Sequence, residues 1–340
     1  MDGQDKLRPR VKLLIAGDLR SDFEVTQDFL ELLTGYDILR VGDILADSAV
    51  ADEVEALVRG LDSDDLGTNV LLERLKNLRW IHSMTAGVEE VVSDRLVERG
   101  ILLTNSAGCY AGGIGEYVLA ALVCLFRGLP ELLCAKRTGL WMPHELGREV
   151  AGSRVGVVGY GGIGRRVGEL ALTAGADVWA ICRDPTRADR QAGADGIRVS
   201  GPDSLNAMLE VSDAVVVAVS LNASSHHMFD DEQFRMMKRS AVLVNVSRGS
   251  VIREEALVVA LESRSISGAV IDTTEREPLP SDSKLWQTAN LWITPHMAGG
   301  TREGRARALS LLQWNLTRYR DGSLRDLRNV VDVARELSGR

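Results

Sequence analysis

The sequence predicts an α/β protein with two doubly wound parallel-sheet domains, and three observations lead to this fold class. Short runs of Val, Ile and Leu alternate with amphipathic helical stretches along most of the 340 residues, as in consecutive βαβ units. The alternation occurs in two blocks, 12–84 and 155–293. A glycine-rich turn follows the first apolar run of the second block, at the point where a helical pattern begins.

Apolar runs in the first block are expected to form strands of one sheet. These runs are Leu13–Ala16, Ile38–Val41, Val54–Val58 and Trp80–Met84, with a further strand at Leu102–Asn105, and helices are expected near Asp22–Leu33 and Asn69–Leu75. The strand–helix alternation predicts a parallel sheet without a cofactor motif of its own.

The second block predicts a larger sheet. Its expected strands are Val155–Val158, Val178–Ile181, Ala214–Val219, Val242–Asn245, Gly268–Ile271 and Leu291–Ile293, and its expected helices lie near Arg165–Ala174, Ser204–Val211 and Glu254–Ser263. Near-continuous Val, Ile and Leu runs are typical of parallel strands buried on both faces. We therefore expect the nucleotide-binding domain here.

Two long helices suggest how the blocks are joined. Ile114–Arg127 carries an apolar stripe at helical spacing and is either a crossover between domains or an ordinary buried helix. Thr301–Arg320 has no strand after it in the second block, so we place it on the first domain. The prediction is a Rossmann domain (105–298) inserted in a flavodoxin-like substrate domain (1–104 and 299–340).

The segment VGVVGYGGIG combines a strand-like run with a GxGxxG turn at Gly159, Gly161 and Gly164. In such a turn the first glycine bends tightly, the second lets backbone approach a pyrophosphate, and the third allows close helix packing. The helix N-terminus adds N–H groups and a partial positive charge. Gly162 and Ile163 complete the expected cofactor-binding turn.

Composition argues for small-molecule chemistry. The chain is 45% hydrophobic and 26% charged, with a formal net charge of −8, which disfavours binding to nucleic acid or an anionic membrane. The four cysteines lack metal-ligand spacing and do not resemble a disulfide framework. The N-terminus, MDGQDKLRPR, has no apolar stretch behind it, so we expect no metal, reduced thiols and a cytoplasmic protein.

Ligands bind at the carboxyl ends of parallel strands, and four charged or titratable residues follow predicted strands there: Arg248, Asp272, Glu277 and His296. An Arg can bind a substrate carboxylate with two hydrogen bonds and polarise the neighbouring carbonyl. A His can give a proton to the developing alkoxide, and a nearby Glu raises its pKa. Together they predict hydride transfer to a carbonyl beside a dinucleotide.

At this point the chain resembles the D-isomer-specific 2-hydroxyacid dehydrogenase family over nearly its whole length. The segments that carry the resemblance are, in order, WIHSMTAGVEE, NSAGCYAGGIGEYVLAAL, VGVVGYGGIG, MKRSAVLVNVSRGSVIREEALVVAL, GAVIDTTEREPLP and LWITPHMAGGT.

The resemblance implies a role for each site residue. Arg248 would anchor the carboxylate, His296 would be the acid/base with Glu277 as its partner, and Asp272 would bind the nicotinamide carboxamide. Gly87 and Val88 N–H groups would hold the other side of the carboxylate. The remaining implied contacts are Met84 and Ala86 with substrate and Ser220 and Val246 with cofactor.

The residues after the second Rossmann strand bear on the choice of cofactor. An enzyme that prefers NAD usually ends this strand with Asp or Glu, whereas here Cys182 is followed by Arg183, with Arg187 nearby. We therefore expect NADP, preferred over NAD. The alternative is that Asp184 reaches the ribose and NAD binds.

Several positions depart from the family pattern or leave two interpretations open. Thr273 and Thr274 replace a valine and an aromatic residue, Asn222 a frequent Thr, and Ala107 a frequent Arg, which leaves the substrate pocket's shape and polarity open. Two further residues, Trp141 and Arg59, each leave two interpretations open. Trp141 lies in a segment resembling the family's dimerisation arm and either reaches a partner's active site or is a buried interface residue. Arg59 either binds a distal anionic group or forms a surface salt bridge.

We expect an NAD(P)-dependent oxidoreductase, acting as a homodimer, that transfers hydride between the cofactor and the C2 carbonyl of a 2-oxo acid such as glyoxylate, hydroxypyruvate or a larger analogue. Domain closure would exclude water from the reaction. The alternatives are a dinucleotide-sensing, corepressor-like binding protein and a phosphite dehydrogenase.

Overall fold

The structure is a computed structural model, and it describes residues 10–19, 23–61, 67–141, 147–186 and 196–338. The chain divides into two compact units, Met1–Tyr110 with Arg302–Arg340 (unit 1) and Ala111–Thr301 (unit 2). Both divisions fall a few residues after the boundaries expected from the sequence. Each unit is an α/β domain with a wholly parallel sheet.

Unit 1 has a five-stranded sheet in the order β2-β1-β3-β4-β5, the flavodoxin-like order. Its elements are β1 (Val11–Ala16), α2 (Gln27–Leu33), β2 (Tyr36–Arg40), α3 (Val41–Ala46), α4 (Ser48–Asp52), β3 (Ala56–Arg59), α5 (Thr68–Arg74), β4 (Trp80–Ser83), α6 (Asp94–Glu98), β5 (Leu102–Asn105), α14 (Arg302–Arg320) and α15 (Val333–Ser338). Helix α14 does pack in this unit, since the Tyr36 hydroxyl donates to the Leu316 carbonyl at 2.5 Å.

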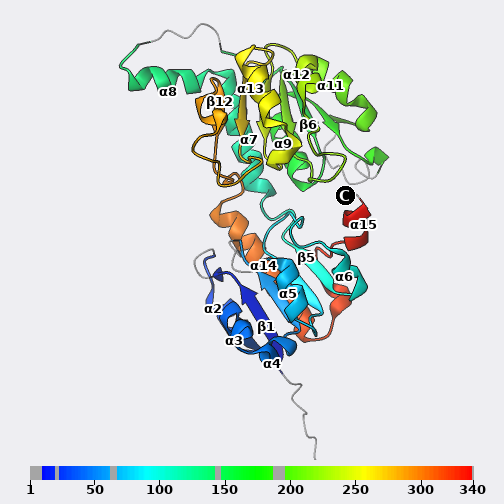
Figure 1. Cartoon of the computed structure of the whole chain (residues 1–340). Helices are drawn as coiled ribbons and strands as arrows, with labels where there is room; N and C mark the ends of the chain where they lie inside the picture. Colours follow the sequence, from blue (N-terminus) through cyan, green and yellow to red (C-terminus); the bar gives the residue numbers. More distant parts are fainter. Residues whose placement is uncertain (1–9, 20–22, 62–66, 142–146, 187–195, 339–340) are drawn as a thin grey trace, which may run out of the picture. The chain divides into compact units, whose positions relative to one another are not determined.

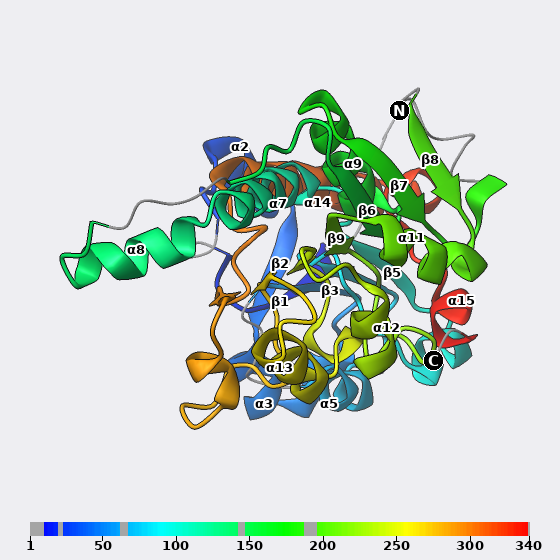
Figure 2. The same ribbon diagram turned by 90° about the horizontal axis from the view of Figure 1, so that it is seen from above.

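Unit 2 has seven strands in the order β12-β11-β10-β9-β6-β7-β8, which extends the Rossmann order by one strand. Figure 2 shows β6, β7 and β8 in succession. Its elements are α7 (Ala111–Phe126), α8 (Leu129–Arg137), β6 (Arg154–Val158), α9 (Gly162–Thr173), β7 (Asp177–Ile181), β8 (Ile197–Ser200), α11 (Leu205–Val211), β9 (Ala214–Val217), α12 (Asp231–Met236), β10 (Val242–Asn245), α13 (Glu254–Glu262), β11 (Gly268–Ile271) and β12 (Leu291–Ile293).

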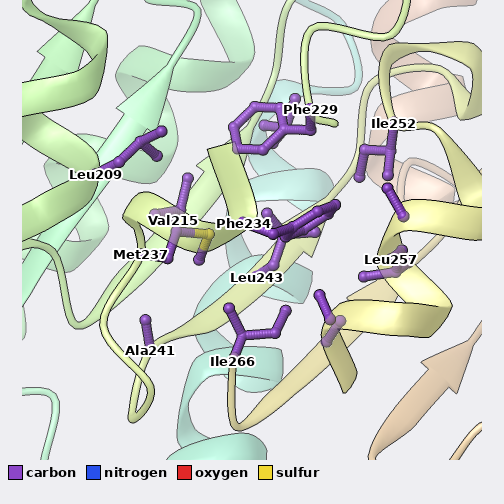
Figure 3. Packing of buried hydrophobic residues seen from close by; sticks show 14 of the residues in the cluster. Leu209, Val215, Phe229, Phe234, Met237, Ala241, Leu243, Ile252, Leu257 and Ile266 are labelled. Atoms are coloured by element: carbon purple, nitrogen blue, oxygen red, sulfur yellow. The ribbon is translucent and has the colours of Figure 1, made fainter. Parts of the chain in front are cut away.

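The apolar runs of the sequence form the interior of this sheet. Strands β9, β10 and β11 have four residues each, all of them buried. Figure 3 shows Phe229, Phe234 and Leu243 packed together in the core of unit 2. This burial on both faces of the strands is what positions their carboxyl ends rigidly, and those ends carry the site.

Element boundaries differ from the sequence prediction where local chemistry outweighs hydrophobicity. Helix α2 begins at Gln27, not near Asp22, because Thr26 caps it and its hydroxyl accepts the N–H of Phe29 at 3.3 Å. Strand β9 ends at Val217, two residues before the apolar run does. The edge strand β8 was not predicted, because its four residues are only partly buried or exposed and lack an apolar run.

Helix α8 extends from the rest of unit 2 in both views (Figure 1 and Figure 2). Within the described residues, no single helix is long and apolar enough to cross a membrane, although α7 and α8 together, bent by 69°, meet the same criteria of length and composition.

Candidate active site

The glycine turn after β6 has the geometry that a dinucleotide pyrophosphate requires. Gly159 has φ +97°, and a Cβ on it would lie 2.5 Å from the Ala218 carbonyl oxygen. A Cβ on Gly164 would lie 1.8 Å from the Gly159 oxygen. By contrast, the Cβ position of Gly161 has no heavy atom within 4 Å. Two glycines therefore pack the turn, and the third leaves backbone open to a ligand at the N-terminus of α9, where Gly162 and Ile163 form the first turn.

Strand β7 leads to the residues expected to select the cofactor. Arg183 and Asp184 are both exposed beyond the strand's end. The Asp184 carboxylate accepts a hydrogen bond from the Thr186 hydroxyl at 2.7 Å, and Arg187 lies outside the described residues. A cationic and an anionic side chain thus both lie at the position that binds the ribose or its 2′-phosphate in this fold.

Ser220 and Val246 follow the neighbouring strands β9 and β10. The Ser220 carbonyl accepts from the Ser225 hydroxyl at 2.7 Å, and the N–H of Val246 donates to the Val217 carbonyl at 3.1 Å. Both lie at the same sheet edge as the glycine turn, which is where the sequence places the cofactor.

His296 and Glu277 form a close pair in unit 2. The Nδ1 atom of His296 lies 2.8 Å from Oε2 of Glu277. Oε1 of the same carboxylate accepts the N–H of Thr274 at 3.1 Å. Each carboxylate oxygen therefore has its own partner, which fixes the orientation of the carboxylate toward the imidazole.

The pair is electrostatically coupled in the direction that suits an acid/base. The hydrogen bond with Glu277 raises the pKa of His296 above its ordinary value, against the opposing effect of burial. For Glu277, burial alone would raise the pKa, but the hydrogen bond with His296 and the positive charges of His296 and Arg248 lower it. About half of the His296 side chain is exposed, so its other nitrogen can meet a ligand.

Arg248 lies near this pair, since its charge acts on the pKa of both His296 and Glu277. It follows β10 with an extended backbone, and its Nη1 donates to the Ser247 carbonyl at 2.8 Å. The Asn245 amide in turn donates to the Arg248 carbonyl at 3.2 Å. The structure thus places the predicted guanidinium, carboxylate and imidazole in one unit, with the imidazole and the carboxylate in direct contact.

Asp272 is buried at the end of β11, and it binds the loop that carries His296. Its Oδ1 accepts from the Thr294 hydroxyl at 2.6 Å and from the Met297 N–H at 2.9 Å, and its Oδ2 accepts from the Ala298 N–H at 2.9 Å. These bonds hold His296 in the left-handed region, at φ +51°. The sequence did not predict this role, although a hydroxyl directly after β12 was a usable signal.

The threonines that depart from the family pattern bind within the chain. Thr273 and Thr274 are buried. The Thr273 hydroxyl accepts from the Asn245 amide at 3.3 Å, and the Thr274 hydroxyl donates to the Arg276 carbonyl at 2.9 Å. Their hydroxyl groups therefore shape the loop rather than add unsatisfied polar groups to it.

Unit 1 carries the loop with the remaining predicted substrate residues. Met84 is buried, and its N–H donates to the Arg59 carbonyl at 2.9 Å. The Thr85 hydroxyl donates to the Gly87 carbonyl at 2.7 Å, and the Asn105 amide donates to the Ala86 carbonyl at 2.7 Å. Val88 is also buried. The loop is fixed chiefly through its carbonyl oxygens.

Arg59 is not a surface residue. Only 7% of it is exposed, at the carboxyl end of β3, and its Nη2 lies 3.7 Å from the Glu90 carboxylate. The salt bridge expected from the sequence therefore forms with an exposed glutamate, but Arg59 itself is buried, because its strand lies between β1 and β4.

Trp141 is 93% exposed and follows α8, whose Leu133 is 52% exposed; Leu140 is 58% exposed. These three apolar side chains are therefore exposed to solvent in the single chain.

Three comparisons with known proteins are informative. Residues 119–298 match the family model for the D-isomer specific 2-hydroxyacid dehydrogenase, NAD binding domain. A glyoxylate reductase from Korarchaeum cryptofilum is 31% identical over 280 residues, which cover 80% of this chain and 81% of that protein. An (S)-sulfolactate dehydrogenase from Chromohalobacter salexigens is 34% identical over 239 residues, which cover 70% and 76%.

A solved structure extends the likeness to the fold. The D-isomer specific 2-hydroxyacid dehydrogenase from Xanthobacter autotrophicus Py2, in complex with NADPH and MES, aligns with a TM-score of 0.76 at 25% identity and covers 96% of this chain and 100% of that one.

Proposed function

We infer the reaction of this chain from the family to which it belongs: it is a member of the D-isomer specific 2-hydroxyacid dehydrogenases, NAD(P)-dependent oxidoreductases that act on the CH–OH group of 2-hydroxy acids. We propose that it works as a reductase of the C2 carbonyl of a small 2-oxo acid, namely glyoxylate, hydroxypyruvate or a larger analogue. The observation that carries the proposal is the 2.8 Å contact between His296 and Glu277 beside Arg248.

Each member of the catalytic group has one role in this reaction. The Arg248 guanidinium binds the substrate carboxylate and polarises the carbonyl. Protonated His296 gives its proton to the developing alkoxide, and Glu277 stabilises the imidazolium before transfer. By the family resemblance, the substrate-binding residues of unit 1 would be Met84, Ala86 and the N–H groups of Gly87 and Val88.

The residues of unit 2 fit a bound dinucleotide. Gly159, Gly161 and Gly164 with the α9 N-terminus would hold the pyrophosphate, a fit supported by the open Cβ position of Gly161. Asp272 would bind the carboxamide through the remaining acceptor capacity of its Oδ2, and Ser220 and Val246 would line the site. When bound, the nicotinamide supplies hydride to C2 of the substrate.

We propose NADPH as the preferred cofactor. Arg183 is exposed beyond β7 and offers a charge for a 2′-phosphate, and the Xanthobacter relative was solved with NADPH. The alternative is NAD held through Asp184. Replacing Arg183 by Ala should raise the KM for NADPH about tenfold or more and leave the KM for NADH nearly unchanged. An unchanged NADPH KM would favour the alternative.

We also propose that the protein is a cytoplasmic homodimer. The exposed Leu133, Leu140 and Trp141 support a second copy as the partner that covers them, and the four cysteines are free thiols, as a reducing compartment favours. Sedimentation should give a dimer for the wild type and dissociation for Leu133→Asp. A monomeric wild type would refute the proposal.

A specific observation favours a second candidate substrate class, 2-oxo acids with a distal anionic group. The Arg59 side chain is buried at the carboxyl end of β3, and its Glu90 partner is 88% exposed. A distal carboxylate or sulfonate could compete with Glu90 for it. The sulfolactate dehydrogenase relative carries such a group in its named substrate.

The test is a set of initial rates for a panel of 2-oxo acids, with and without a distal anion, using NADH and NADPH in parallel. Arg248→Ala should severely raise the KM for the 2-oxo acid, whereas His296→Ala should mainly lower kcat. Near wild-type kcat/KM in either variant would refute that residue's role. Turnover also separates the enzyme from a dinucleotide-sensing protein, and phosphite in the panel tests phosphite oxidation.

A further inference from the structure

The loop that carries Glu277 is held by a residue outside the catalytic group. Glu254 is the first residue of α13, and its Oε1 accepts the N–H of Glu275 at 2.7 Å. In return, the Glu275 Oε1 accepts the N–H of Glu254 at 3.3 Å. We call these two reciprocal hydrogen bonds the 254–275 clasp.

The same part of the loop is fixed from a second side. A Cβ added to Gly249 would lie 1.9 Å from the Thr274 carbonyl carbon and 2.2 Å from the Glu275 nitrogen. The Thr274–Glu275 peptide therefore rests directly on Gly249, the residue after Arg248. With Gly249 on one side and Glu254 accepting the peptide's N–H, this peptide has little freedom to move.

The fixed peptide leads directly to the acid/base pair. Thr274 donates its N–H to Oε1 of Glu277 at 3.1 Å, and Oε2 of Glu277 contacts His296 Nδ1 at 2.8 Å. A shift of the peptide would move the Thr274 amide and turn the carboxylate away from the imidazole. The orientation of Glu277 thus depends on the clasp.

We propose that Glu254 is a positioning residue for the acid/base pair, because by accepting the N–H of Glu275 it holds the Thr274 amide where that amide orients Glu277 toward His296. The inference rests on the proposed roles of Glu277 and His296.

The charged groups around the pair and the clasp are few, which makes a titration interpretable. The charged groups that act on the pKa of His296 are Glu277, Arg248 and Asp272. Burial raises the pKa of Glu254, and the charged groups that act on it are Glu275 and Glu255. His227 Nε2 lies 3.2 Å from the Glu275 carboxylate. The carboxylate of Glu254 accepts the N–H of Glu275, and replacing Glu254 by Ala removes this acceptor.

The experiment is an NMR titration of His296 in the full chain, labelled with ¹³C-histidine, with His296→Gln to assign its resonance among the five histidines. In Glu254→Ala the pKa of His296 should fall toward its ordinary value, because the Glu277 hydrogen bond is its largest support. Glu254→Gln keeps an acceptor oxygen and should retain the wild-type pKa. The neighbouring Glu255→Ala is the matched control and should also retain it.

Kinetics with glyoxylate and NADPH provide a second readout. Glu254→Ala should lower kcat about tenfold, a part of the range that general acid catalysis supplies, with little change in the KM for glyoxylate, since Arg248 is not displaced. A merely structural role would lower the melting temperature without moving the His296 titration.

Two outcomes separate this inference from the proposed function. If Glu277→Gln does not lower the pKa of His296, the acid/base pair is wrong and the role of Glu254 falls with it. If Glu277→Gln lowers that pKa and Glu254→Ala leaves it unchanged, only the role of Glu254 is overturned. If Glu254→Ala does not fold, Glu254→Asp replaces it, because the shorter side chain withdraws the carboxylate by one methylene. The pKa of His296 should fall in this variant as well. A wild-type pKa of His296 in Glu254→Asp would overturn the proposal.

Discussion

Gly161 offers the sharpest test of dinucleotide binding, because an alanine there should affect the ligand and spare the fold. Its backbone, at φ −81° and ψ −158°, is open to alanine. The added methyl would meet no heavy atom within 4 Å. We therefore expect Gly161→Ala to change the free energy of unfolding by less than about 1 kcal/mol.

The same methyl would stand where a pyrophosphate must approach the first N–H groups of α9. Each hydrogen bond to a charged group contributes about 1.5–3 kcal/mol. Losing one of them raises the Kd for NADPH about 10- to 150-fold. Both the direction and the size of the effect follow from the open space at this glycine.

Isothermal titration with NADPH measures the Kd, and thermal unfolding checks the fold. The matched variant is Gly164→Ala, whose Cβ would lie 1.8 Å from the Gly159 oxygen and which should therefore lose stability as well as affinity. The reasoning is refuted if Gly161→Ala binds NADPH with the wild-type Kd, or if it loses as much stability as Gly164→Ala.

Three further predictions concern protons and hydrogen bonds. Glu277→Gln removes the main support of protonated His296, so the pH above which the kcat of reduction declines should fall; a pH profile identical to that of the wild type would contradict the pairing. Complete burial lowers the pKa of His82 to about 3 from 6.5, so the unfolded chain binds more protons between these values and stability falls as the pH drops through that window, by about 3 kcal/mol between pH 7 and pH 4. The free energy of unfolding of His82→Asn, measured in urea, should not show this decrease between pH 7 and pH 4. The same pH dependence in the variant and the wild type would contradict the prediction. Thr294→Val removes the hydroxyl that donates to Asp272 and should lower kcat about tenfold, whereas Thr294→Ser should keep the wild-type kcat. An unchanged kcat in the valine variant would exclude a role for this hydrogen bond.

The sequence predicted the strands well because a parallel sheet buries both faces, and this leaves continuous apolar runs such as Val242–Asn245. The same rule placed Arg248, Glu277 and His296 together, since strand ends share one edge. Strand β8 was missed because an edge strand needs no such run.

Other features depend on contacts between segments far apart in the sequence. Arg59 is buried because its strand, β3, lies between β1 and β4, and no local pattern of residues reveals this. The Glu254–Glu275 bonds join residues 21 apart. The hydrogen bonds from the His296 loop to Asp272 form because β11 and β12 are paired in the sheet, which the sequence does not show. Sequence spacing indicates which residues share an edge, and only coordinates show which of them hydrogen-bond.

The central claim is that one imidazole, His296, gives the proton in reduction and takes it back in oxidation. Its most direct test is the pH dependence of kcat in both directions with one 2-oxo acid and its 2-hydroxy acid. Reduction should decline and oxidation should rise as the pH increases through a single pKa above that of an ordinary histidine, and both limbs should vanish in His296→Gln. Limbs that persist in that variant, or that run in the same direction, would contradict the claim.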